Sequence, residues 1–78
     1  MPTERAQRLD RLAAAVRILN ERGEVVTHSN LASSAQRTWG TSIYTSREYV
    51  EDCIKTGRIK ANDGRLYPNT EQPPEEVK

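Results

Sequence analysis

Few side chains in this sequence could take part in catalysis. His28 is the only histidine and Cys53 the only cysteine, so a nucleophile, base and acid arrangement would have to use His28. We expect His28 to be an exposed residue in the first turn of a helix. Cys53 falls on the apolar stripe of an expected helix, where burial raises the pKa of a thiol and lowers its reactivity. We therefore expect no enzymatic activity.

Residues typical of metal and phosphate sites are also missing. Asn62-Asp63-Gly64 offers too few oxygen ligands for a calcium loop, and the sequence has no paired-histidine motif and no glycine-rich phosphate loop. A single cysteine cannot form an intrachain disulfide, which favours a reducing compartment. The sequence therefore predicts neither a metal nor a cofactor, and a cytoplasmic location.

Three basic side chains close to one another form the strongest candidate binding site. Arg58 and Lys60 alternate with the apolar Ile59, so the predicted strand carries its cations on one face. Arg65 follows a turn and joins that face if Leu66 points toward the core. Such a face could hold phosphate groups, or its cations could simply protect an exposed strand edge from pairing with another strand.

A short helix followed by a tight hairpin positions these cations. Thr45 and Glu48 have the spacing of a capping box and Gly57 is a natural stop, so we expect the helix to begin at Thr45 and end at Gly57. Its apolar stripe comprises Tyr49, Val50, Cys53 and Ile54. Asn62-Asp63-Gly64 then predicts the turn of a hairpin that closes at Pro68.

Two further helices are expected upstream. Apolar residues recur at intervals of three and four, which predicts a long helix that ends at Gly23: Leu9, Leu12, Ala13, Val16 and Leu19. Glu24-Val25-Val26 predicts a short strand, and Thr27 can cap a second helix over residues 28–38. The expected core of the whole chain comprises Leu12, Val16, Leu19, Leu31, Ile43, Val50, Ile54, Ile59 and Leu66.

Residues 39–44 form the expected link between the second and third helices. Trp39 either packs at the junction of these helices or stands exposed as a binding anchor. Tyr44 could pack through its ring and still reach a ligand with its hydroxyl group. On the first helix, Ile18 lies off the main stripe, so a homodimer through this helix is expected. Four arginines of that helix either face solvent or contact a partner: Arg5, Arg8, Arg11 and Arg22.

Length and composition limit the chain to one small domain. It has 78 residues and a mean hydropathy of −0.83, which leaves room for one modest core. We expect this domain to span residues 1–68 and to be followed by a disordered polar tail over residues 69–78. No N-terminal segment is apolar enough to cross a membrane, so no membrane association is expected.

The predicted order of helix, short strand, helix, link, helix and hairpin resembles the winged helix-turn-helix superfamily. VTHSNLASSA looks like its second helix, and YVEDCIKTGRIKANDGRLY looks like its recognition helix and wing. The segment from Val50 to Tyr67 is also similar to the small excisionase and MerR-type winged modules. The resemblance covers about residues 5–67 and implies a mainly α fold with a small β-hairpin, an α+β class of three helices plus a wing.

This resemblance implies a small protein that binds double-stranded DNA, as a transcriptional regulator or an accessory architectural factor, with dimers on two half-sites. The recognition helix would enter the major groove and the wing would approach phosphates. The implied contact residues are Tyr44, Thr45, Ser46 and Arg47 on the helix and Arg58, Lys60 and Arg65 on the wing. The acidic Glu48, Glu51 and Asp52 depart from that pattern, because carboxylates near phosphate cost affinity. Winged helices also serve as protein-interaction modules without DNA binding, which is the alternative function.

Overall fold

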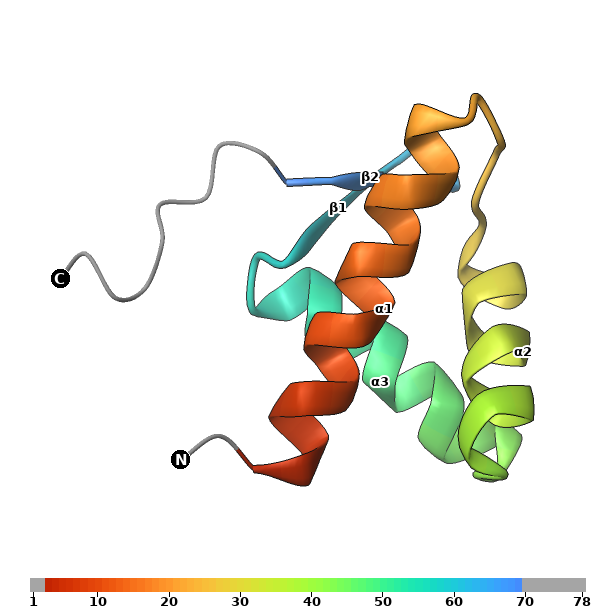
Figure 1. Ribbon diagram of the computed structural model, residues 1–78, viewed down its shortest axis with the longest axis vertical. Helices are drawn as coiled ribbons and strands as arrows, with labels where there is room; N and C mark the ends of the chain where they lie inside the picture. Colours follow the sequence, from red (N-terminus) through yellow and green to blue (C-terminus); the bar gives the residue numbers. More distant parts are fainter. Residues whose placement is uncertain (1–2, 70–78) are drawn as a thin grey trace, which may run out of the picture.

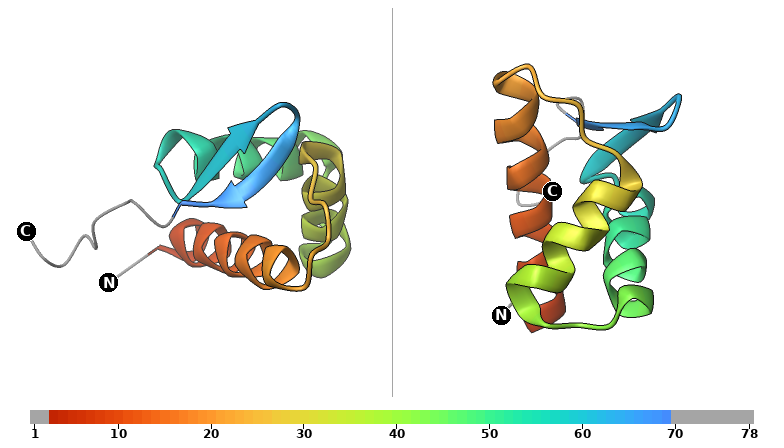
Figure 2. Two further views of the ribbon diagram at one scale, coloured as in Figure 1. Left: turned by 90° about the horizontal axis from the view of Figure 1, so that it is seen from above. Right: turned by 90° about the vertical axis from the view of Figure 1, so that its right-hand side faces the viewer.

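Three helices and one antiparallel hairpin make up residues 3–69, the part of the chain that the computed structural model describes (Figure 1). The elements are α1 (Glu4–Glu21), α2 (His28–Trp39), α3 (Ile43–Lys55), β1 (Ile59–Asn62) and β2 (Arg65–Pro68). Their order confirms the predicted α+β class, a winged-helix-like layout that is mainly helical. Figure 2 shows α1 on one side of the molecule, α3 on the opposite side, α2 across the end between them, and the hairpin over α3 with β2 next to α1.

Side-chain hydroxyl groups cap all three helices at their N-termini. The Oγ1 atom of Thr27 accepts a hydrogen bond from the backbone N–H of Asn30 at 3.1 Å, which confirms the predicted cap of α2. The predicted capping box of α3 is wrong, because α3 begins earlier. Ser42 is its cap and accepts from the backbone N–H of Thr45 at 3.1 Å. This earlier start places Ile43 against the core, an apolar contact that a start at Thr45 would forgo.

A short turn joins α2 to α3, and the predicted link over residues 39–44 is too long. Trp39 is the last residue of α2 and Ile43 the first of α3, so only residues 40–42 connect them. Gly40 has a φ of 68°, a left-handed conformation that glycine adopts without a side-chain clash, and its N–H donates to the Gln36 carbonyl at 2.8 Å. The two helices therefore form a tight helix-turn-helix.

The hairpin turns where the sequence predicts, but through two residues, because Asn62 of the predicted turn belongs to β1. Asp63 and Gly64 both have positive φ, at 59° and 78°, which is the conformation that a two-residue turn needs to match the twist of its strands. The strands pair antiparallel, with Asn62 opposite Arg65. Asparagine, aspartate and glycine tolerate such angles better than other residues, so the turn is encoded locally.

The predicted strand at residues 24–26 is wrong, because this segment makes only one bridge to the hairpin. Thr27 pairs with Arg65, and the N–H of Leu66 donates to the carbonyl of Val26 at 2.8 Å. The next carbonyl along β2, that of Leu66, accepts instead from the side-chain amide of Asn20 at 3.1 Å. A side chain of α1 thus takes the place that a longer third strand would need.

The core lies where the three helices meet the inner face of the hairpin. Its buried apolar residues are Leu9, Leu12, Val16, Val26, Leu31, Ala32, Ala35, Tyr49, Val50, Cys53, Ile59 and Leu66. Six of the nine predicted core residues belong to this set, while Leu19, Ile43 and Ile54 are partly buried at its margin. Asn69, predicted as the start of the tail, donates its side-chain amide to the Gly57 carbonyl at 2.8 Å. The rest of that predicted tail lies outside the described residues.

The single thiol is buried in this core, as its place on the α3 stripe predicts. Its Sγ donates to the Leu9 carbonyl at 3.4 Å. Loss of solvation raises the pKa of Cys53 from the ordinary value of 9.0 to about 11, although the nearby Arg58 opposes this shift. Cys53 therefore stays neutral and unreactive at physiological pH.

The raised pKa of Cys53 predicts a loss of stability at alkaline pH. The unfolded chain releases the thiol proton near its ordinary pKa of 9.0, whereas the folded chain holds it until about 11. The stabilisation is thus complete below pH 9.0 and is lost as the pH rises toward 11. Denaturant unfolding measured across this pH range should show that the free energy of unfolding falls more steeply for the native sequence than for Cys53→Ala. Equal falls would mean that the thiol ionises as easily in the folded state as in the unfolded state.

Candidate nucleic-acid interface

One side of the molecule brings together the outer face of α3 and the hairpin. In the right-hand view of Figure 2, α1 lies on the left, α3 lies on the right, and the tip of the hairpin extends past α3 on that same right side. The α3 residues on the outer face recur at intervals of three and four and are all exposed: Tyr44, Arg47, Glu48, Glu51 and Lys55. We call these five residues, together with Lys60 and Arg65 of the hairpin, the α3–hairpin face.

The hairpin presents Lys60 and Arg65 outward, as strand alternation predicts. Antiparallel pairing places Lys60 opposite Tyr67 and Asn62 opposite Arg65, and facing residues of a ladder project to the same side. The other side of the hairpin carries Ile59 and Leu66, both buried. Both predicted wing cations therefore lie on the outer, exposed side of the hairpin.

Arg58 does not belong to this face, and the prediction of three outward cations is wrong at this position. Its side chain is only 16% exposed. Its Nε donates to the Asp10 carboxylate of α1 at 2.7 Å, and one terminal nitrogen donates to the Thr56 hydroxyl at 2.8 Å. Arg58 precedes β1, so strand alternation does not govern its direction. It fastens the base of the hairpin to α1.

The contact between Arg58 and Asp10 is expected to stabilise the fold modestly. Arg58→Gln and Asp10→Asn should each lower the free energy of unfolding by about 1 kcal/mol, and the double variant by little more than either one, because all three lose the same pair. Urea unfolding followed by the fluorescence of Trp39, the only tryptophan, measures these values. Fully additive losses would show that the pair contributes nothing.

The leading end of α3 presents only part of the predicted contact set. Tyr44 is 75% exposed and Arg47 is also exposed, whereas Thr45 is half-buried. Ser46 is fully buried and shares a hydrogen bond of 2.7 Å with the Thr41 hydroxyl, so it is not available to DNA and its prediction is wrong. Ser46 faces inward because it precedes Tyr49 and Val50 by three and four positions and so lies on the buried stripe of α3.

The structure turns one of the three predicted carboxylates away from the α3–hairpin face. Asp52 accepts a hydrogen bond from Arg5 Nε of α1 at 3.0 Å, and this bond raises the pKa of the arginine. Glu51 stays on the face and lies 3.0 Å from His28 Nε2 at the start of α2. Glu48 is exposed there as well. Two carboxylates therefore share this face with four cations.

The contact between His28 and Glu51 was not foreseen in the sequence. His28 is partly exposed, as a residue in the first turn of α2, but its ring points toward α3. When the imidazole is protonated it forms an ion pair with Glu51 and offsets one negative charge of the α3–hairpin face. The two residues are 23 positions apart on different helices, so no local pattern could have revealed the pair.

Trp39 packs within the fold, in agreement with one of its two predicted roles. Its ring meets that of Tyr49 edge-to-face with centroids 5.9 Å apart, and the guanidinium of Arg8 lies 5.2 Å from the Trp39 centroid. Arg8 also donates to the Tyr49 hydroxyl at 2.9 Å. This cluster joins all three helices, and two arginines of α1, Arg5 and Arg8, lie over its aromatic rings.

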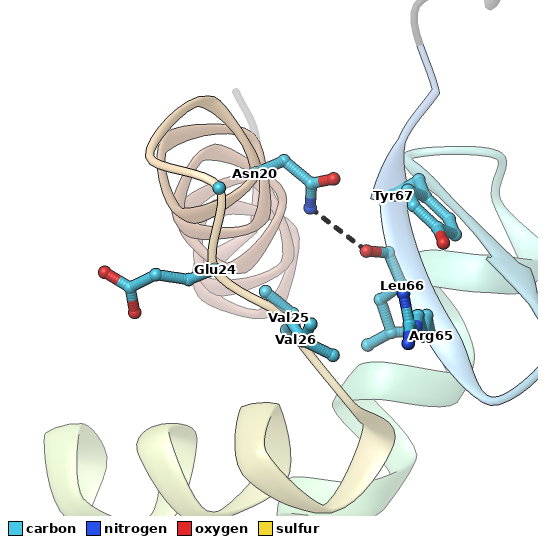
Figure 3. Close-up of a pocket in the computed structure, with 8 residues that line it drawn as sticks. Asn20, Glu24, Val25, Val26, Arg65, Leu66 and Tyr67 are labelled. Carbon is cyan, nitrogen blue, oxygen red and sulfur yellow. Dashed lines mark hydrogen bonds between the residues drawn. The ribbon is translucent and has the colours of Figure 1, made fainter.

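A small hollow lies between the end of α1, the segment before α2, and β2 (Figure 3). Its volume is about 180 Å³. The amide of Asn20 at its rim already donates to the carbonyls of Val16 and Leu66, each at 3.1 Å, while Glu24 points away from Arg65. The hollow therefore brings together no pair of side chains suited to catalysis.

Comparisons with known proteins do not assign a function to this chain. The chain shows no significant match to a protein-family model, a curated protein or a solved structure. Within residues 3–69, no helix combines the length and apolar character needed to cross a membrane. The same part of the chain contains no cluster of three or more histidine, cysteine, aspartate or glutamate side chains that could hold a metal ion.

Proposed function

We propose that this chain binds double-stranded DNA through the α3–hairpin face, as a small transcriptional regulator or an accessory architectural factor. The main support is that the tip of the hairpin, whose outer side carries Lys60 and Arg65, extends past α3 on the side of the molecule away from α1. A helix fits the major groove of B-DNA, and cations displaced to one side of that helix then lie over the flanking phosphates.

The roles of the residues follow from their reach. Lys60 and Arg65 pair with phosphate oxygens, which gives affinity without sequence preference. Arg47 and Tyr44 lie at the leading end of α3, where an arginine can donate two hydrogen bonds to guanine and an aromatic ring can contact a base or a sugar. Lys55, at the other end of α3, adds a cation near the opposite strand.

Glu48 and Glu51 oppose this binding, and they favour a second candidate function. A carboxylate brought near phosphate repels it unless it accepts from cytosine or orients an arginine. Together with the exposed ring of Tyr44, these carboxylates would suit a mixed polar and apolar protein interface. In that alternative the domain is a winged-helix-like protein-interaction module.

A titration with mixed-sequence duplex DNA tests the proposal. Amide chemical shifts should change on α3 and the hairpin while those on the outer side of α1 stay constant. Affinity should fall steeply between about 50 and 200 mM salt, because binding releases counterions. A protein interface with an apolar centre responds little to salt. No shift at low salt would remove the DNA proposal and leave the protein-interaction alternative.

The two carboxylates of the α3–hairpin face provide a sharper measurement. Glu48→Gln and Glu51→Gln should each raise the affinity for mixed-sequence DNA by about two- to fivefold, since each removes a negative charge near phosphate. Glu4→Gln makes the same change in net charge on α1, on the other side of the molecule, and should change affinity by less than about twofold. Equal effects at all three positions would mean that only net charge matters.

A further inference from the structure

The outward face of α1 carries a second patterned surface, away from the core and from the α3–hairpin face. Five residues on this face recur at alternating intervals of four and three, the spacing of a coiled-coil seam: Gln7, Arg11, Ala14, Ile18 and Glu21. Ile18 is the fourth of these five residues and is 45% exposed. The buried residues of the helix, Leu9, Leu12 and Val16, lie on its opposite side. Ile18 and Ala14 are the two apolar side chains of this seam, one helical turn apart.

The two charged residues of this seam, Arg11 and Glu21, can pair with those of a second α1 helix that runs antiparallel to the first. Among residues 3–69, neither Arg11 nor Glu21 has an ion-pair partner within 4.0 Å. Consider an antiparallel pair of α1 helices that cross at the height of residue 16 along the helix axis. Arg11 of each copy then faces Glu21 of the other. The same register places Ile18 of each copy on Ala14 of the other, where the small side chain admits it. One register thus satisfies both the charges and the apolar side chains.

We propose that a second copy of this chain covers the seam, and that the two α1 helices pair antiparallel in this register. A parallel pair would place Arg11 against Arg11 and Glu21 against Glu21, so like charges disfavour it. In this register residues 11–21 of the two helices overlap over about 16 Å, and they offer one isoleucine and one alanine as the apolar centre. An interface of that size belongs to the weak class, so the dimer forms at high micromolar concentration.

The dimer has a consequence for DNA that depends on the proposed function. Because α1 and the α3–hairpin face lie on opposite sides of the molecule, pairing through α1 directs the two α3–hairpin faces away from each other (Figure 2). The resemblance implied dimers on two half-sites of one duplex. Two faces that point away from each other cannot bind in that way. They can each hold a separate duplex, so the dimer bridges two DNA segments.

Sedimentation equilibrium without DNA, from about 10 µM to 1 mM, tests the pairing independently of DNA binding. The native sequence should approach twice the mass of one chain at the upper end. Ile18→Asp, Arg11→Glu and Glu21→Arg should each weaken association at least about tenfold. Arg17→Glu makes the same charge change as Arg11→Glu on the same helix but off the seam, and it should leave association within about twofold. Circular dichroism confirms that each variant is folded.

Mixing the two charge variants gives the decisive result. Arg11→Glu alone and Glu21→Arg alone each place like charges together, but a mixed pair restores two opposite-charge contacts, so an equimolar mixture should associate like the native chain. A monomer at 1 mM, unchanged association in both charge variants, or a mixture that stays monomeric would each overturn the pairing. For bridging, an immobilised duplex should capture a second, labelled duplex with the native chain but not with Arg11→Glu. A native chain that binds single duplexes and dimerises but bridges none would overturn that consequence alone.

Discussion

Replacing Leu12 by alanine is expected to lower the free energy of unfolding by about 2–5 kcal/mol, which is a large part of the total stability of so small a domain. Leu12 is only 3% exposed and lies in the middle of α1 against the buried faces of the other elements. Removing its branched end leaves a cavity that close-packed neighbours can fill only in part. Thermal and urea unfolding, followed by circular dichroism, measure the loss.

Ile18→Ala is the matched control for this variant. It also shortens an aliphatic side chain on α1, but at an exposed position, so it should cost less than about 1 kcal/mol in a dilute, monomeric sample. Ile54→Ala should fall between the two, because Ile54 is only partly buried at the margin of the core. If Leu12→Ala and Ile18→Ala had equal effects, the assignment of the buried side of α1 would be wrong.

Replacing both Lys60 and Arg65 by glutamine is expected to weaken the binding of mixed-sequence DNA by roughly 25- to 100-fold at 0.1 M salt. Each phosphate contact that is lost should also lower the slope of log affinity against log salt by about 0.9. Both side chains are exposed on the hairpin, so the double variant should fold normally. Fluorescence anisotropy with a labelled duplex, repeated at several salt concentrations, measures both quantities.

Arg17→Gln with Arg22→Gln serves as the matched control for the hairpin variant. It removes the same net charge from α1 and from its C-terminal cap, outside the hairpin, and should weaken binding by less than about threefold. If the hairpin variant binds DNA as tightly as the native chain, Lys60 and Arg65 only protect a strand edge, and the protein-interaction alternative is the better one. If both double variants weaken binding equally, the hairpin has no special place in the DNA contact.

The sequence by itself determined the elements of this fold, because each depends on neighbours along the chain. Apolar residues at intervals of three and four located the buried side of α1, and the hydroxyl of Thr27 marked the start of α2. Gly57 marked the end of α3, and Asn62-Asp63-Gly64 marked the place of the hairpin turn. Strand alternation then correctly placed Lys60 and Arg65 on the outer side of the hairpin.

Only the tertiary structure decided which polar side chains remain free for a partner. Arg58 contacts Asp10 across 48 positions of the chain, and Asp52 contacts Arg5 across 47. Strand alternation and helical period say which way a side chain leaves the backbone, but not which distant group it meets there. Ser46 was misplaced because it lies on the buried stripe of α3, where its hydroxyl meets that of Thr41. The candidate site therefore kept its helix and its hairpin but exchanged part of its residues, because long-range pairing and burial, unlike caps and turns, are not local properties of the sequence.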